Sequence, residues 1–187
     1  MRKLKGMPLS AVLLFEDEIQ LRLFPVLRRA WALKGEPAAV GITGRNAKRV
    51  LFGTINLRTG HRIVMRQPKM NQVGFQAFLR LLRRHYPARQ IWLLLDEGSA
   101  HTAPQSQALA QSLNIQLVWL PKQCSELNAM DHLWKELKAD ISANYQYATI
   151  DEHAATAEEY TLKLTNRQAL KRAGILSENF WLKSFLK

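Results

Sequence analysis

A run of five large apolar residues, Ile91-Trp-Leu-Leu-Leu95, leads directly into Asp96. The run has no helical period, and this pattern is typical of a fully buried strand. Gly98 and Ser99 then indicate a turn, and Thr102-Ala-Pro-Gln105 has the composition of a helix start with Thr102 as N-cap. We therefore expect Asp96 at the carboxyl end of a central strand, the edge at which open α/β sheets bind ligands.

The rest of the chain predicts a mixed sheet. Residues 11–15 form a second apolar run that ends in Glu16-Asp17-Glu18, and residues 50–57 and 61–66 predict a hairpin. Residues 91–119 predict a strand, a helix and another strand, which is a parallel crossover. Further helices are expected from Asn71 to Pro87 and over 129–143. The fold class is therefore α/β, with an antiparallel hairpin, parallel strands and helices on both faces.

Charge limits the partners of this chain. Lys and Arg number 27 and Asp and Glu number 15, which gives a net charge of +12. This excess favours a polyanionic partner, nucleic acid before an acidic membrane surface.

Cys124 is the only cysteine, so a disulfide within the chain is excluded and a reducing compartment is the default. No apolar run approaches the ~18 residues of a membrane helix, and we expect a cytoplasmic protein.

Three aspartates are candidates for chemistry, and each has a simpler explanation. Asp17 could be a solvated acid at a strand end, and Asp96 could cap the turn that follows it. Asp131 falls in the first turn of a helix with Asn128 as N-cap, where an acid stabilises the helix end. Together, in a basic protein, they suit a hard divalent cation such as Mg²⁺, which can promote phosphodiester transfer on DNA.

Several segments resemble transposases related to mariner elements and their bacterial insertion-sequence relatives. Asp96-Glu-Gly-Ser-Ala-His101 resembles their DN-x-x-x-H segment, and Asp17-Glu18 resembles their first catalytic D-E dipeptide. Leu127 to Trp134, followed by Leu137-Lys138, is similar to L-N-P-I-E-x-x-W-x-x-L-K. Trp31 to Gly35 resembles their W-x-x-x-G, and 34 residues separate Asp96 from Asp131, a spacing that this family uses. The resemblance covers roughly residues 11–140.

The resemblance implies an RNase H-like catalytic domain over residues 11–145, a basic lead-in over 1–10 and a C-terminal helical appendage over 146–187. Asp17, Asp96 and Asp131 would form its catalytic triad and hold Mg²⁺ or Mn²⁺, with two ions expected. The implied activity is metal-dependent phosphodiester hydrolysis and strand transfer in DNA transposition. The implied partners are the element ends, target DNA and a second copy of the chain, with no membrane, in a bacterial, nucleoid-associated setting.

The chain also departs from the family pattern. Glu97 stands where the family usually has Asn, Ala129 replaces Pro, and Asp131 replaces the commoner Glu. The N-terminal helix-turn-helix domain of such transposases is expected to be absent, as in a catalytic half, a truncated reading frame or a split gene with a separately encoded helix-turn-helix partner. The alternative function is a non-catalytic transposase remnant that serves as a basic DNA-binding or dimerisation module.

Four residues are candidates for supporting roles: Glu18, His101, Asn128 and Trp134. His101 could orient a carboxylate, touch phosphate or be structural, and Trp134 is expected to fill the core beneath Asp131. Basic side chains are candidate contacts to the DNA backbone; they are Arg28, Arg29, Arg45, Lys48, Arg49, Arg83 and Arg84.

Overall fold

A five-stranded mixed sheet forms the centre of the computed structural model, which describes residue 4 and residues 6–36 and 39–185. The strands lie in the order β3-β2-β1-β4-β5. Their bounds are β1 (Val12–Arg22), β2 (Lys48–Asn56), β3 (Arg62–Gln67), β4 (Ile91–Leu95) and β5 (Ile115–Trp119). β1, β2 and β3 pair antiparallel, whereas β1, β4 and β5 are parallel. The predicted hairpin and parallel crossover are both confirmed.

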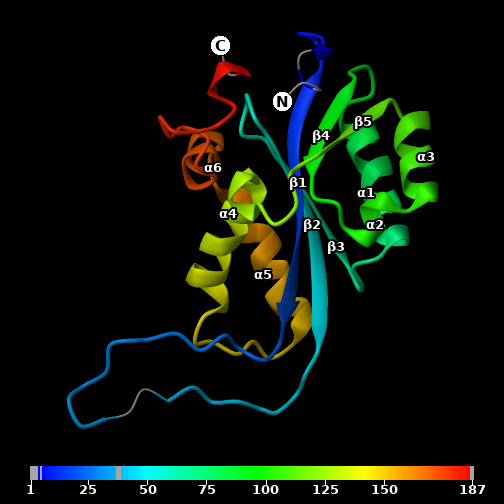
Figure 1. Ribbon diagram of the computed structural model, residues 1–187. Helices are drawn as coiled ribbons and strands as arrows, with labels where there is room; N and C mark the ends of the chain where they lie inside the picture. The colour runs from blue at the N-terminus through cyan, green and yellow to red at the C-terminus, as the bar shows by residue number, and fades with distance from the viewer. Residues whose placement is uncertain (1–3, 5, 37–38, 186–187) are drawn as a thin grey trace.

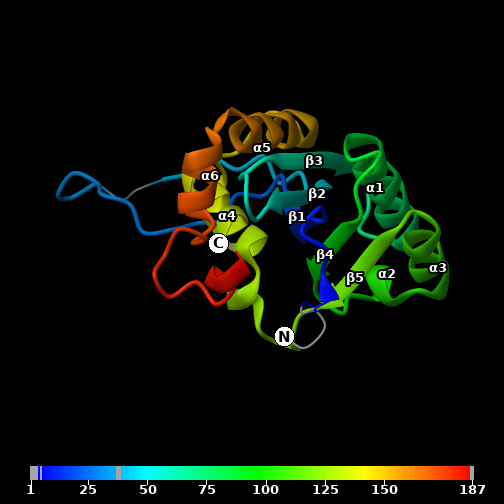
Figure 2. The ribbon, with the colours of Figure 1, turned by 90° about the horizontal axis from the view of Figure 1, so that it is seen from above.

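Helices cover both faces of the sheet (Figures 1 and 2). One face carries α1 (Gln72–His85), α2 (Ser99–Thr102) and α3 (Pro104–Ser112). The other carries α4 (Ala129–Leu137), α5 (Ile150–Lys163) and α6 (Asn166–Arg172). A π-helical stretch (Lys138–Ser142) extends α4, so the predicted helix over 129–143 is present with a changed last turn. Short 3-10 turns lie at Ser125–Leu127 and Lys183–Phe185.

Alternation along β1 divides the core into two parts. Leu13 and Phe15 pack with the buried residues of α4 and α5, while Val12 and Leu14 pack with those of α1. This is the period-2 pattern of a strand that is buried on both sides. Asp17 therefore points to the α4 side of the sheet, and its neighbours in sequence point to the α1 side.

The predicted N-cap at Thr102 is wrong. Thr102 is the last residue of α2, and its Oγ1 donates a hydrogen bond to the carbonyl oxygen of Gly98 at 3.1 Å. α3 starts separately at Pro104, with Ala103 at the cap position and no side-chain cap. The chain coils directly after Gly98, and this coiling brings His101 against the sheet.

The residues expected to form a C-terminal appendage include α5, and this helix packs into the core. Ala154 and Ala157 are fully buried in the same cluster as Phe15. Arg62 of β3 donates to the carbonyl oxygens of Thr161 and Leu162, and it binds Asn166 Oδ1 at 2.7 Å. In the basic lead-in, Leu4 is buried in this cluster, while residues 1–3 and 5 lie outside the described residues.

A long excursion joins β1 to β2 and extends beyond the sheet (Figure 1). Its described residues, 23–36 and 39–47, contain no helix or strand. They contact the body through an isolated bridge between Val26 and Ala143 and through hydrogen bonds to Asn144 and Gln146. Trp31 is fully exposed on it, and Leu27 and Leu33 are also exposed. Among the described residues, no helix is long and apolar enough to cross a membrane.

Candidate active site

The three predicted aspartates line one cavity of about 320 Å³. Asp17 reaches it from β1, Asp96 from the residue after β4, and Asp131 from the first turn of α4. Asp17 and Asp96 also line an adjoining cavity, which Glu18 and His101 border. The structure thus brings together carboxylates that lie up to 114 residues apart in the sequence.

Asp17 has an environment that disfavours its charged form. Burial, followed by the nearby carboxylates of Glu18, Asp131 and Asp96, raises the pKa of Asp17 to about 8. A proton is therefore held on this carboxyl at neutral pH unless another positive charge replaces it.

A glycine lets α4 approach Asp17 closely. Gly53 is the residue opposite Asp17 in the β1–β2 ladder. A Cβ atom at Gly53 would lie 2.6 Å from Cε of Met130 and 2.9 Å from Cη2 of Trp134, which is closer than such atoms can come. Trp134 is fully buried, so the expectation that it fills the core beneath Asp131 is consistent with its position.

Asn128 fixes the start of α4 in two ways. Its Oδ1 accepts a hydrogen bond from the backbone N–H of Met130, which caps the helix as predicted. Its Nδ2 donates to the carbonyl oxygen of Glu16 at 2.8 Å, in the middle of β1. The buried Asn128 side chain thereby holds the first turn of α4, with Asp131, beside Asp17.

Asp96 combines the turn-capping role with access to the cavity. Its Oδ1 accepts a hydrogen bond from the N–H of Gly98 at 2.9 Å and lies 2.9 Å from Nδ1 of His101. The hydrogen bond from His101 lowers the pKa of Asp96. Oδ2 accepts no hydrogen bond from the described part of the chain, so this oxygen is available to a ligand in the cavity.

Asp131 is paired within its own helix. Lys135 Nζ lies 2.7 Å from Asp131 Oδ2, one turn further along α4. The pair is partly exposed, and such i, i+4 pairs contribute only ~0.3–0.5 kcal/mol. A divalent cation in the cavity could displace the ammonium of Lys135 at little cost.

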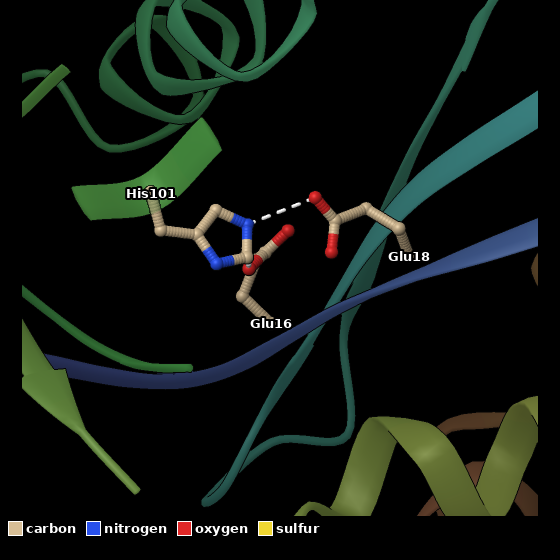
Figure 3. A group of neighbouring side chains, drawn as sticks. All are labelled: Glu16, Glu18 and His101. Atoms are coloured by element: carbon tan, nitrogen blue, oxygen red, sulfur yellow. Dashed lines mark hydrogen bonds and ion pairs between the residues drawn. The ribbon is translucent and has the colours of Figure 1, made fainter. Parts of the chain in front are cut away.

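Glu16, Glu18 and His101 form a second cluster on the α1 side of β1 (Figure 3). His101 Nε2 lies 2.8 Å from Glu18 Oε1 and 3.6 Å from Glu16 Oε2. The imidazole is buried and its ring centre lies 4.5 Å from that of Phe75. The carboxylate of Glu16 is fully buried, and neither of its oxygens has a hydrogen-bond partner among the described residues.

The protonation of this cluster follows from its burial and charges. Burial, with the nearby charge of Glu18, raises the pKa of Glu16 well above its ordinary value. Burial alone would lower the pKa of His101, but the Glu16 carboxylate and the hydrogen bonds with Asp96 and Glu18 outweigh it and raise that pKa to about 11. The imidazole of His101 is therefore charged at neutral pH.

Glu16 was missed by the reasoning from sequence, although a signal was present. The alternation of β1 assigns Glu16 to the same buried face as Leu14. A buried acid needs a partner of opposite charge. His101 lies in α2, on the side of the sheet that Glu16 faces, and it is the side chain that can supply the positive charge.

The rim of the cavity carries further charges. Glu97, which replaces the usual Asn, pairs with Lys122, whose Nζ lies 3.3 Å from Glu97 Oε2. The lysine therefore offsets part of the negative charge that Glu97 adds. Cys124 also lines the cavity.

The basic residues proposed as DNA contacts differ in their surroundings. Arg49 makes two hydrogen bonds to the carboxylate of Asp151. The Arg83 guanidinium donates to the carbonyl oxygens of Tyr86, Pro87 and Arg89 near the amino end of β4, away from Asp96. Arg84 is exposed on the last turn of α1, and Lys48 begins β2. Arg28, Arg29 and Arg45 are exposed on the excursion.

The donor set of the cavity fits a hard divalent cation. Three carboxylates converge there with one of them protonated for lack of a compensating charge, and carboxylate oxygens are the ligands that Mg²⁺ and Mn²⁺ prefer. The Glu16, Glu18 and His101 atoms are also close enough together to bind a metal ion. The imidazole there already bridges Asp96 and Glu18 through its two nitrogens.

Comparisons with known proteins agree with this geometry. Residues 12–153 match the model of a family described as DDE superfamily endonuclease. A protein of Shigella sonnei described as the insertion element IS630 uncharacterized 39 kDa protein is 25% identical over 138 residues, which are 73% of this chain and 40% of that protein. The chain thus matches less than half the length of this curated relative.

Solved structures with a similar fold include two of Mos1 transposase. The Mos1 transposase paired-end complex with left transposon end gives a TM-score of 0.70 at 16% identity, over 99% of this chain and 57% of that one. The catalytic domain of Mos1 mariner transposase gives a TM-score of 0.63 at 13% identity, over 99% of this chain and 85% of that one. At these identities the likeness shows the fold.

Proposed function

Because this chain belongs to the DDE superfamily of endonucleases and has an RNase H-like fold, we propose that it is the catalytic domain of a DNA transposase. It would cut phosphodiester bonds at the ends of a mobile element and join the freed 3′ ends to target DNA. The observation that carries the proposal is the single cavity lined by Asp17, Asp96 and Asp131.

The proposed cofactors are divalent cations, Mg²⁺ or Mn²⁺, held as two ions by Asp17, Asp96 and Asp131. Mos1 structures described with Mg and with Mn support this choice. Bound divalent ions make a water or 3′-hydroxyl more acidic and stabilise charge on the leaving oxygen. The chain's own contribution is to hold the three carboxylates in place, to release the proton of Asp17 and to present Lys122 at the rim, where an ammonium can bind a phosphate.

The proposed partner is DNA. The net charge of +12 and the DNA-bound Mos1 complexes support it. Sequence-specific recognition of element ends would come from a helix-turn-helix region, either in a longer form of the protein or in a separate chain. The matched stretch is 40% of the curated relative, which leaves room in that protein for a further region.

A second copy of the chain is proposed to join the complex on DNA. The exposed Leu27, Trp31 and Leu33 side chains on the excursion support association, because exposed apolar surface of this kind marks interaction sites. Light scattering of the wild type and of Trp31→Ala, with and without DNA, tests it. A dimer on DNA that weakens in the variant is expected, and a monomer on DNA in both would contradict it.

Nicking of supercoiled DNA in Mg²⁺ or Mn²⁺ tests the proposed function. We expect nicking by the wild type that stops when the ions are chelated and that Asp96→Asn abolishes, while circular dichroism shows that the variant is folded. Asp151→Asn, which removes the surface partner of Arg49, is the matched control and should keep the activity. Salt-sensitive DNA binding without any metal effect would instead favour the non-catalytic module.

A further inference from the structure

Both nitrogens of His101 face carboxylate oxygens. Nδ1 lies 2.9 Å from Asp96 Oδ1 and 3.1 Å from the backbone carbonyl oxygen of Asp96, and Nε2 lies 2.8 Å from Glu18 Oε1. An imidazole can serve two such acceptors at once only when both nitrogens carry hydrogen. The ring is therefore a doubly donating bridge between β1 and the residue that follows β4.

The bridge is held rigidly on the Glu18 side. The Glu18 side chain is only 6% exposed and the His101 side chain 3%. The imidazole also packs against Phe75, and the buried Glu16 carboxylate lies 3.6 Å from Nε2. The ring consequently has no room to turn, and its Nδ1 has a fixed direction.

Asp96 is different, because its side chain is 68% exposed. An exposed carboxylate at a strand end samples several rotamers, and fixing one of them costs conformational entropy. The bonds from His101 and from the N–H of Gly98 both fall on Oδ1. They select one rotamer and leave Oδ2 for the cavity.

We propose that His101 is a positioning residue that uses its Glu18-anchored ring to fix the Asp96 carboxylate for cation binding. The proposal rests on the proposed function, since it concerns the same site. His101 touches neither ion nor DNA in this role. It donates a hydrogen bond to a residue that binds the metal, and loss of such a hydrogen-bond partner typically costs about 10–100-fold in metal affinity.

Two substitutions separate the two ends of the bridge. The amide nitrogen of Asn lies two bonds beyond Cβ, as Nδ1 does, so His101→Asn keeps the donor to Asp96. The amide nitrogen of Gln lies three bonds beyond Cβ, as Nε2 does, so His101→Gln keeps the donor to Glu18 and loses the one to Asp96. Both variants remove the ring and its charge, and each is the control of the other.

The measurements are the Mn²⁺ dissociation constant by isothermal titration and the Mn²⁺ concentration that gives half-maximal nicking. We expect His101→Gln to raise both by about 10–100-fold, with nicking restored at saturating Mn²⁺. His101→Asn should shift them several-fold less. A merely structural role would instead lower the thermal stability of both variants equally and leave no difference between their Mn²⁺ affinities.

Gly98→Ala provides a second test should the ring variants fail to fold. A Cβ atom there would lie 3.1 Å from both Asp96 Oδ1 and His101 Nδ1, and the backbone φ of −59° suits alanine. The added methyl group should push the Asp96 carboxylate and the His101 ring apart, so Gly98→Ala alone should weaken Mn²⁺ binding. If His101→Gln folds, adding Gly98→Ala to it should weaken Mn²⁺ binding less than Gly98→Ala does alone, because the contact between Asp96 and His101 is already lost.

The outcomes distinguish this proposal from the function on which it rests. If the wild type binds no Mn²⁺, or binds it equally well after Asp17→Asn, the proposed function fails and this inference fails with it. If the wild type binds Mn²⁺ through Asp17 but neither His101→Gln nor Gly98→Ala weakens binding, the inference alone is overturned. Electron spin echo modulation from a His101 nitrogen on bound Mn²⁺ would overturn it too, because His101 would then be a ligand.

Discussion

The indole ring of Trp134 occupies the place where a side chain on Gly53 would stand. Gly53 lies opposite Asp17 in the β1–β2 ladder, and Trp134 lies one helical turn after Asp131. This contact determines how near α4 comes to the sheet, and therefore how near Asp131 comes to Asp17.

Gly53→Ala should consequently destabilise the protein by about 1–3 kcal/mol, the usual cost of overpacking a core. It should also weaken Mn²⁺ binding, because α4 has to move outward and take Asp131 with it. Urea unfolding and isothermal titration measure the two effects. Gly41→Ala, at a glycine with open space around it, is the control and should change neither. Equal results for the two variants would contradict this account of α4.

Asn128 provides a second test of the α4 position. Asn128→Ser keeps a good N-cap but loses the donor to the Glu16 carbonyl oxygen. We expect a loss of about 1–3 kcal/mol, since a buried acceptor is left unsatisfied. Asn71→Ser is the matched control, because Asn71 caps α1 through the N–H of Gly74 and lies on the surface. Denaturant unfolding should show a clearly larger loss for Asn128→Ser, and an equal loss would refute the role of the bond to β1.

The pKa of Asp17, raised to about 8 by burial and the neighbouring acids, predicts a pH dependence of cation binding. A cation has to displace the Asp17 proton, so binding releases protons below that pH. The apparent Mn²⁺ affinity should rise with pH by up to about tenfold per unit towards pH ~8. Titrations near neutral pH, in buffers of different ionisation enthalpy, should detect the released proton. An affinity independent of pH in this range would show that Asp17 is not titrated by the ion.

Arg62 tests whether the C-terminal helices belong to the core. Its guanidinium donates to Gly60, Thr161, Leu162 and Asn166, and the single nitrogen of a lysine cannot reach all of them. Arg62→Lys should therefore cost about 1–3 kcal/mol through unsatisfied acceptors and should make the end of α5 more sensitive to protease. Arg66→Lys, in the more exposed pair with Glu158, should stay within about 0.5 kcal/mol. No difference between the two would mean that α5 is held mainly by other contacts.

The sheet was predictable from sequence because its strands are uninterrupted apolar runs, as at residues 91–95, and because Arg58-Thr-Gly60 is a strong turn signal. The N-caps at Asn71 and Asn128 were predictable for a similar reason, since each cap acts within a few residues. The N-cap prediction at Thr102 was wrong because the Thr102 hydroxyl donates to the Gly98 carbonyl oxygen within α2. The residues that follow Thr102 nevertheless have the composition of a helix start.

The residues that were not predicted depend on contacts distant in sequence. Glu16 meets His101 across 85 residues, and Arg62 meets Asn166 across 104. The buried side of α5 could not be assigned because its small alanines give only a weak amphipathic pattern. For the aspartates, strand ends and helix caps indicated the position of each one, while their convergence depended on the sheet order.

The most direct test of the central claim is Mn²⁺ titration of the wild type beside Asp17→Asn, Asp96→Asn and Asp131→Asn. The account predicts that each of the three variants loses at least about tenfold in affinity, whereas Asp151→Asn binds as the wild type does. Mn²⁺ affinity that is unchanged in Asp131→Asn would contradict it, because the site would then be formed without α4.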